Sequence, residues 1–463
     1  MPPRAYLPDL LLAAGEVRAG AALVVEGGRV TGVGAAPPGA ELVRLAGSAI
    51  LPALASAHSH AFQRALRGKT QLRAAPHSTF WSWREAMYAV AARIGPDDLE
   101  AVAALLFLEL VRAGVAAVGE FHYLHRDPTG AAYADPDELA KRTVAAARAV
   151  GLRVVLLRAS YARAGAGEAA AGAQRRFADA SPDDAALAVE RLARAHAADP
   201  LVSFGLAPHS VRACPAGWIA ALAAEAVRRR LPLHLHAAEQ PRELDACRAE
   251  HGTTPVRLLE RLGALGPRTT LVHAIHVDGE EIAAIAGAGA RVCACPTTER
   301  DLADGVVPAD RLLAAGVPLA LGTDSNVEVD LLAEARALEG HLRLVTGERA
   351  VLGRAGEGED ALALRLFDLA SRGGRAALGL EGGRLAPGEP ADFQVVDLAD
   401  PSLAGAAAGD LATYAVFSLS RTAVRDLYVA GEPVVLAGQA ARLDERAVVA
   451  RGAAALARLA RDR

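Results

Sequence analysis

Histidine and acidic side chains recur where short apolar stretches of this sequence end. His58 and His60 directly follow the apolar run of residues 49–57, and His236 stands near the end of the stretch LPLHLHAAE. Similar positions elsewhere in the chain carry His209, His273 and Asp324. Imidazole nitrogens and carboxylate oxygens are common ligands of Zn²⁺, so these residue types indicate a divalent-metal site.

A metal held by two histidines of one strand, a third histidine and a carboxylate would keep an open position for water. The ion would lower the pKa of that water to about 7. Glu239 stands three residues after His236, where it would carry protons between the water and a leaving group. His273 would hydrogen-bond the attacking water or the tetrahedral centre.

Each of these residues taken singly also has a plain structural interpretation. An isolated His-x-His pair fits two polar residues at the point where a strand reaches solvent. His234 and His236 face the same side of one strand, so spacing leaves the choice of ligand between them open. Asp324 follows Gly-Thr and would also serve as a helix N-cap. Three further histidines are expected only to make local hydrogen bonds: His122, His125 and His276.

Alternating apolar strands and alanine-rich helical segments occupy the middle of the chain. We expect helices near residues 95–113, 183–198, 215–230 and 278–288. Eight βα repeats predict a (β/α)8 TIM-type barrel, with a doubly wound open sheet as the alternative. The expected strands are Ile50–Ala57, Val115–Gly119, Val154–Arg158, Val202–Ala207, Pro232–His236, Thr269–His273, Arg291–Ala294 and Val317–Leu321.

Both ends of the chain have a different texture. Residues 22–34 read as two short strands joined by a Gly-Gly turn, and similar stretches (FQVVDL and LYVAGEPVVLAG) return near the other end. We therefore expect a small β-sandwich domain formed from both termini. Residues 1–48 and 376–463 would build it, together with a terminal helix, and residues 49–375 would form the barrel. The Gly- and Ala-rich segment Ala162–Ser181 is expected to be a mobile loop.

Composition narrows the class of protein. The 463 residues are 52% hydrophobic and carry a net charge of -4, which indicates neither nucleic acid nor a membrane as partner. The four cysteines (Cys214, Cys247, Cys293 and Cys295) form no C-x-x-C pair, so we expect buried free thiols rather than a metal site. The first twenty residues make a poor secretory signal, and no apolar run is long enough to span a membrane. A cytoplasmic protein is expected.

The order of these groups along the chain resembles the amidohydrolase superfamily, whose members carry H-x-H after strand one, His on strands five and six, and Asp on strand eight. The stretch GGRLAPGEPADFQVVDL also resembles the segment that returns the chain of these proteins to the small β domain. In the deaminase branch a catalytic Glu follows the metal-binding His by three residues, which selects His236 and Glu239 here. The resemblance implies the metal ligands His58, His60, His236 and Asp324, and the catalytic residues Glu239, His273 and Asp324.

The same resemblance implies one divalent metal ion per chain, with Zn²⁺ as the default. Binuclear members of the superfamily carry a carboxylated lysine or a glutamate on a middle strand. The only lysines are Lys69 and Lys141, neither of which falls at a strand end, and strand three ends in Arg158 instead. A homodimer is common in the superfamily and is expected here.

Within the superfamily the sequence looks most like the formimidoylglutamate deiminases, which hydrolyse N-formimidoyl-L-glutamate in histidine degradation. HSHAFQRALRG, STFWSWREAMY, GEFHYLH, APHSVRA and LHLHAAEQ carry this likeness. It implies a small dicarboxylate substrate bound by Gln63, Arg84, Tyr123, His209 and Arg212. Arginine suits bidentate recognition of carboxylates, although a single arginine in so arginine-rich a chain is more often a surface residue. One departure is Asp301, where the family pattern has Asn.

Two alternative functions follow from the same scaffold. A deaminase acting on a purine or pyrimidine ring would prefer aromatic and amide groups in its pocket, and the paired arginines disfavour it. A non-catalytic scaffold protein would lack one or more metal ligands, whereas this sequence keeps all of them.

Overall fold

The computed structural model describes residues 2–71 and 78–460. Met1, residues 72–77 and residues 461–463 lie outside the described residues. Met1 and 461–463 belong to the predicted terminal segments 1–48 and 376–463.

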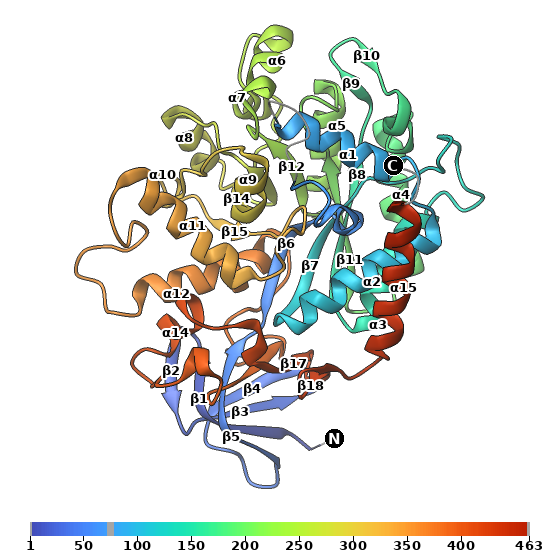
Figure 1. Ribbon diagram of the computed structural model, residues 1–463. Helices are drawn as coiled ribbons and strands as arrows, with labels where there is room; N and C mark the ends of the chain where they lie inside the picture. The colour runs from blue at the N-terminus through green and yellow to red at the C-terminus, as the bar shows by residue number, and fades with distance from the viewer. Residues whose placement is uncertain (1, 72–77, 461–463) are drawn as a thin grey trace.

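Eight parallel strands form one curved sheet at the centre of the molecule (Figure 1). A parallel bridge between Ser59 and Asp324 joins the first strand to the chain that follows the last. This arrangement confirms the (β/α)8 barrel and rules out an open sheet. In chain order the strands are β6 (Leu54–Ser59), β7 (Val115–His122), β8 (Arg153–Ser160), β11 (Val202–Pro208), β12 (Leu233–Ala237), β13 (Thr269–His273), β14 (Arg291–Ala294) and β15 (Leu319–Leu321).

The first expected strand is divided between two sheets. Residues Ile50–Ala57 fall partly in β5 (Glu41–Pro52), which belongs to the terminal sheet, and partly in β6 of the barrel. Ala53 separates the two strands, and the next residue, Leu54, donates its N–H to the carbonyl of Gly114 beside β7. Because both strands are buried and apolar, hydrophobic periodicity carries no mark of the boundary between them.

A second sheet contains strands from both termini, as expected. Its order is β19-β18-β17-β16-β5-β1-β3-β4, and β2 pairs with β1. Strand β1 was not among the strands expected from the sequence. It pairs in parallel with β5 and lies inside the sheet. Besides β5, the members are β1 (Arg4–Ala13), β2 (Glu16–Ala19), β3 (Ala22–Glu26), β4 (Arg29–Gly34), β16 (Phe393–Asp397), β17 (Val424–Val429), β18 (Glu432–Leu436) and β19 (Gln439–Ala440).

Helices surround the barrel, and Figure 1 shows the last one, α15, running beside α2. The helices that follow or connect the barrel strands are α1 (Phe80–Ala91), α2 (Pro96–Arg112), α3 (Glu138–Val150), α4 (Pro182–Ala195), α5 (Ala216–Arg229), α6 (Pro241–His251), α7 (Pro255–Arg261), α8 (Gly279–Gly287), α9 (Pro296–Leu302), α10 (Ala309–Ala314) and α11 (Leu331–Thr346). The C-terminal part adds α12 (Ala361–Asp368), α13 (Gly374–Ala377), α14 (Leu411–Phe417) and α15 (Glu445–Ala460). Short helical turns are η1 (Ala61–Leu66), η2 (Gly172–Arg176), η4 (Pro401–Leu403) and η5 (Arg421–Ala423).

The amino-terminal end of the barrel is closed by a helical segment in which α12 runs through a π-helical turn, η3 (Leu369–Gly373), into α13. A Cβ atom added at Gly374 would lie 2.0 Å from the carbonyl oxygen of Ala55 in β6. Only glycine permits so close an approach of the helix to the strand. We refer to residues 361–377 as the closing helix.

The segment Ala162–Ser181, which was expected to be a mobile loop, contains short regular elements. It contains the hairpin strands β9 (Arg163–Gly165) and β10 (Glu168–Ala169) and the turn η2. The predicted domain boundaries fall inside elements, since residue 49 lies in β5 and residue 375 in α13. Among residues 2–71 and 78–460, no helix combines the length and the apolar character needed to cross a bilayer.

Candidate active site

The carboxyl-terminal end of the barrel brings together the four predicted metal ligands. His58 and His60 lie at the end of β6, His236 lies in β12, and Asp324 follows β15. Their ligand atoms all lie within 4.8 Å of one another. Asp324 Oδ1 is 3.5 Å from His58 Nε2 and 3.3 Å from His60 Nε2. Atoms bound to zinc at about 2.0–2.1 Å in a tetrahedron are about 3.3 Å apart, so the spacing fits such an ion.

Backbone carbonyls orient two of these imidazoles. His60 Nδ1 lies 2.9 Å from the carbonyl oxygen of Phe121, and His236 Nδ1 lies 3.1 Å from that of His209. When each Nδ1–H donates to its carbonyl, Nε2 keeps a free lone pair, which is how metal-binding histidines are usually held. His234 lies deeper in the barrel, where its Nε2 contacts the carbonyl of Ala377 at 2.8 Å, and so takes no part in this group.

Burial sets the charge states that metal binding requires. It lowers the pKa of His58 to about 3 and also lowers the pKa values of His60 and His236. Burial alone would raise the pKa of Asp324, but the surrounding histidines, His58 first, lower it below its ordinary value. Neutral imidazoles and an ionised carboxylate are the forms that coordinate a cation.

Glu239 and His273 border this group. His273 Nε2 is 3.6 Å from Glu239 Oε1 and 3.7 Å from Asp324 Oδ2. Its other nitrogen, Nδ1, contacts Glu299 Oε1 at 3.1 Å. Burial opposes the charged form of His273, but the hydrogen bond to Glu299 and the nearby carboxylates raise its pKa well above the ordinary value.

Two of these side chains are placed by unusual backbone conformations. His273 has φ 75° and Asp324 has φ 42°, in the left-handed region that residues other than glycine seldom adopt. Such conformations persist where the surrounding structure imposes them, and they are frequent at functional sites.

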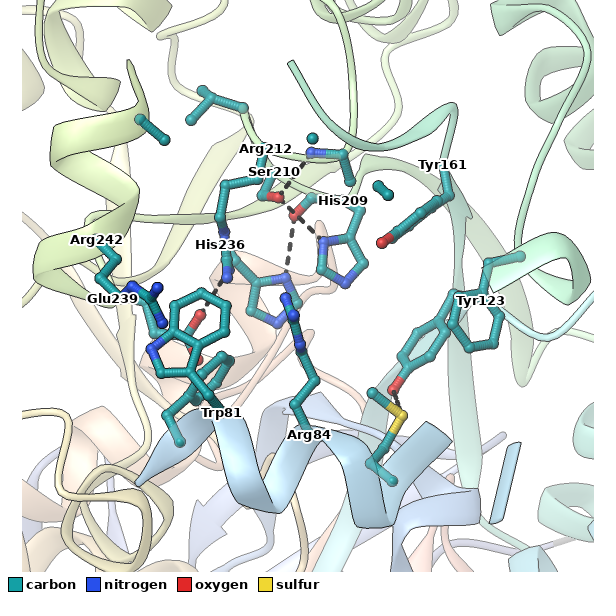
Figure 2. A pocket seen from close by; sticks show the side chains of 18 of the residues that line it. Trp81, Arg84, Tyr123, Tyr161, His209, Ser210, Arg212, His236, Glu239 and Arg242 are labelled. Atoms are coloured by element: carbon teal, nitrogen blue, oxygen red, sulfur yellow. Dashed lines mark hydrogen bonds and ion pairs between the residues drawn. The ribbon is translucent and has the colours of Figure 1, made fainter. Parts of the chain in front are cut away.

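A pocket of about 360 Å³ opens over the metal-ligand group and is lined by all five predicted substrate-binding residues. Gln63 donates from Nε2 to Tyr123 Oη at 2.8 Å. In Figure 2, Arg84 extends from α1 toward His209 and His236, while Arg212 lies beside Glu239. The cavity is thus lined by the five predicted substrate-binding residues and by Glu239, His60, His236 and Asp324. His58 and His273 do not line it but lie against Asp324. The individual roles of these residues remain predictions.

The arginines of the pocket differ in their surroundings. Arg212 Nη2 contacts Glu239 Oε2 at 2.8 Å. Burial would lower the pKa of Arg212, but Glu243 and Glu239 outweigh burial and raise it. Arg84 has no carboxylate partner among the described residues, and its buried Nε–H lacks an acceptor. Its guanidinium carbon lies 4.4 Å from the centre of the Trp81 ring.

Four residues of this region were not predicted as site residues. Arg242, in the first turn of α6, lies 4.7 Å from the Trp81 ring and lines the pocket. Glu299 orients His273, and Glu243 lies near Arg212. Trp81 and Arg242 adjoin the motifs FWSWREAMY and LHLHAAEQ, so proximity to those motifs was an available signal. No motif pointed to Glu299, because it lies 26 positions away from His273 in the chain.

Several residues that were set aside lie outside the ligand group. His125 Nε2 and His276 Nε2 contact the carbonyls of Ala159 and Asp304. All four cysteines are buried and free, as expected. Cys295, however, lies close enough to His273 and Asp324 to form a second possible ligand group. Asp301, the departure from the family pattern, contacts Gln71 and borders a different cavity.

Known proteins resemble this chain over most of its length. The sequence profile of the Amidohydrolase family matches residues 49–434. A formimidoylglutamate deiminase of Pseudomonas aeruginosa is 41% identical over 85% of this chain and 86% of its own. A 5-methylthioadenosine/S-adenosylhomocysteine deaminase of Natronomonas pharaonis is 31% identical over 91% of this chain and 90% of its own.

A solved structure, that of an amidohydrolase from Brucella melitensis, matches with a TM-score of 0.89 and 32% identity, covering 98% of this chain and 99% of its own. Together with the profile match across the barrel, these likenesses establish that the chain belongs to the amidohydrolase family.

Proposed function

We propose that this protein hydrolyses N-formimidoyl-L-glutamate to N-formyl-L-glutamate and ammonia, a step of histidine degradation. One observation carries the proposal. The five residues expected to bind this substrate come from separate parts of the sequence, and all of them line the pocket above the metal-ligand group. The 41% identity to a formimidoylglutamate deiminase supports the same substrate.

Members of the amidohydrolase family bind a metal, and His58, His60, His236 and Asp324 would hold one divalent cation here. When bound, such an ion supplies Lewis acidity and lowers the pKa of water to about 7. Zn²⁺ suits a donor set of three imidazoles and one carboxylate. A second ion in the Cys295 group is disfavoured, because burial raises the pKa of that thiol well above its ordinary value and because Asp324 would have to serve both groups.

The chain's own residues then move protons. Asp324 orients the attacking water and accepts its proton, which lets the oxygen add to the formimidoyl carbon. His273, whose pKa is raised by the surrounding carboxylates, would donate a hydrogen bond to that oxygen. Glu299 fixes the ring of His273 through Nδ1. Glu239 delivers a proton to the departing nitrogen. The C–N bond to that nitrogen breaks, a C=O bond forms, and ammonia leaves, so one water is consumed for each ammonia released.

Arginines would recognise the two carboxylates of the substrate. Arg84 has no acidic partner in the described part of the chain, so a substrate carboxylate would meet it without displacing an ion pair. Arg212 already contacts Glu239, so a carboxylate bound there would share the guanidinium with the proton carrier. Bidentate guanidinium–carboxylate pairs give both strength and orientation.

A deaminase acting on a purine or pyrimidine ring is the alternative. The 31% identity to a 5-methylthioadenosine/S-adenosylhomocysteine deaminase over most of the chain favours it. The arginines of the pocket weigh against it, because a neutral ring would leave the half-buried Arg84 without a counter-charge.

An ammonia-release assay separates the two functions. The zinc-loaded protein is given formimidoylglutamate, adenosine, S-adenosylhomocysteine or guanine at matched concentrations. Turnover of formimidoylglutamate that exceeds turnover of every ring substrate would support the proposal. Faster release from a ring would replace it. Arg84→Gln is the matched variant, since it should impair the dicarboxylate far more than a neutral ring.

The family resemblance further supports a homodimer in the cytoplasm, and the segments 1–48 and 376–463 as one small domain around a barrel of residues 49–375. Light scattering during size-exclusion chromatography would test the dimer, which should show twice the 47.7 kDa mass of the chain. Limited proteolysis followed by mass spectrometry would test the boundaries.

A further inference from the structure

A second cavity, of about 460 Å³, lies at the opposite end of the barrel from the active site. Its walls come from the amino-terminal ends of β14 and β15, from the closing helix and from the turn after β1. Its volume lies in the range of ordinary small-molecule sites. None of its lining residues belongs to the active-site pocket described above.

Four arginines line this cavity, with a single acidic side chain, Asp368, among the lining residues: Arg291, Arg365, Arg372 and Arg384. Arg372 and Arg384 share one oxygen of Asp368, at 3.1 and 2.9 Å. Arg365 pairs with Glu357, which lies outside the cavity wall. Arg291 has neither an ion pair nor a side-chain hydrogen bond within residues 2–71 and 78–460. The four arginines and the two carboxylates that pair with them, Asp368 and Glu357, therefore carry a net charge of +2.

The arrangement is unfavourable without a counter-ion. Burial, and then the neighbouring charge of Arg372, lower the pKa of Arg291 below its ordinary value. The Nε–H groups of Arg291 and Arg384 are both buried without an acceptor, and an unsatisfied buried donor costs free energy. Two guanidinium groups that repel each other beside a cavity would both be stabilised by an anion placed between them.

The backbone of the closing helix is irregular at Arg372. Arg372 lies in the π-helical turn η3, between α12 and α13. Isolated π-helical turns are uncommon and are frequent at functional sites. The backbone of Gly383 packs against this turn, because a Cβ added there would lie 2.7 Å from Arg372 Cα. This contact fixes the backbone of Arg372, whose side chain is half exposed beside the cavity.

We propose that this cavity binds a small oxyanion, a phosphate or a dicarboxylate, between the guanidinium groups of Arg291 and Arg372. Both ligands present oxygens that match the forked N–H donors of arginine. The proposal is independent of the substrate assigned to the active site, because the two cavities share no lining residue.

Isothermal titration calorimetry at constant ionic strength tests the site, with inorganic phosphate and succinate as the two probes. Succinate is titrated into an Arg84→Gln background, which weakens binding of dicarboxylates at the active site. We expect saturable binding of at least one probe. We also expect Arg291→Gln to weaken that binding tenfold or more and Arg372→Lys, which keeps the charge but loses the fork, to weaken it severalfold. Whichever probe binds more tightly identifies the class of anion.

The control is Arg228→Gln, which removes an arginine from an exposed pair with Glu225 and should leave the affinity unchanged. Arg291→Gln should fold, since it breaks no ion pair, and its kcat for formimidoylglutamate should equal that of the unmodified protein. Equal affinities in Arg291→Gln and the unmodified protein would overturn the proposal. So would the absence of saturable binding of both probes to the unmodified protein.

Discussion

The two ends of the barrel differ in how one partly buried arginine of each is paired. At the carboxyl-terminal end most buried charged groups have a partner: Arg212 contacts Glu239, and His273 contacts Glu299. At the amino-terminal end the other three cavity arginines have carboxylate partners, but Arg291 has none among the described residues and is repelled by Arg372. The paired end holds its side chains in place before any ligand arrives, which catalysis requires. At the amino-terminal end Arg291 lacks a counter-charge, which a bound anion would supply.

The largest expected effect concerns the proton carrier of the paired end. Glu239→Gln keeps the size of the side chain but cannot carry a proton, so kcat for formimidoylglutamate should fall by about 10²–10⁴-fold. Metal content, measured by inductively coupled plasma mass spectrometry, should stay at one equivalent per chain. Loss of the metal in this variant would mean that Glu239 is a ligand instead.

The next prediction compares the two ends directly. Arg212→Gln leaves Glu239 and the fully buried Glu243 without their cation, so the free energy of unfolding should fall by about 3 kcal/mol. Arg291→Gln removes a charge that has no partner, so the free energy of unfolding should change by less than about 0.5 kcal/mol. Urea denaturation of both variants measures the difference. Equal destabilisation would erase the contrast between the two ends.

Binding of substrate should distinguish two arginines at the same end. Arg84 is half-buried inside the pocket, whereas Arg242 is exposed. Losing a charge-assisted contact to a carboxylate costs about 1.5–3 kcal/mol, so Arg84→Gln should raise KM by about 10–150-fold. Arg242→Gln should change KM by less than about fivefold, as for an exposed charge. Steady-state kinetics on both variants measures the two KM values. A large rise in KM for Arg242→Gln would mean that Arg242, packed against Trp81, also binds substrate.

The smallest expected effect concerns Glu120, a buried acid at the carboxyl-terminal end of the barrel. Burial raises the pKa of Glu120, which has no cationic partner in the described part of the chain, to about 8. Because the unfolded chain ionises this group near pH 4.3, the folded protein keeps a proton that the unfolded chain releases. The stability contributed by the neutral acid is therefore lost as pH rises toward 8.

Between pH 6 and 7 the unmodified protein should thus lose about 1.4 kcal/mol relative to Glu120→Gln. Urea denaturation at both pH values gives the comparison, and parallel stability profiles would contradict it. The glutamine is the matched variant, because it can still accept the 2.7 Å hydrogen bond from Ala61 N.

Much of this architecture could be predicted from local patterns. The barrel strands are short apolar runs, and polar residues at their ends necessarily gather at one edge of a parallel sheet. The three-residue spacing of His236 and Glu239, together with the family resemblance, selected His236 over His234, and the structure places His234 against Ala377 instead.

Other features depend on contacts between distant segments, which local patterns do not encode. The boundary between β5 and β6 lies within one continuous apolar run. Glu299 meets His273 only because α9 folds back over the end of β13. The arginines of the amino-terminal cavity are scattered through a chain rich in arginine, so the cluster becomes visible only in three dimensions.

The carbonyls that orient His60 and His236 have an evolutionary consequence. Every amino acid carries a backbone carbonyl, so substitutions at Phe121 or His209 would remove neither acceptor, and those at His209 would alter the pocket wall. Mutations could therefore reshape the substrate range of the site while the orientation of its ligands is inherited unchanged. Proteins that orient their histidines through backbone carbonyls can therefore change substrate without losing the metal site.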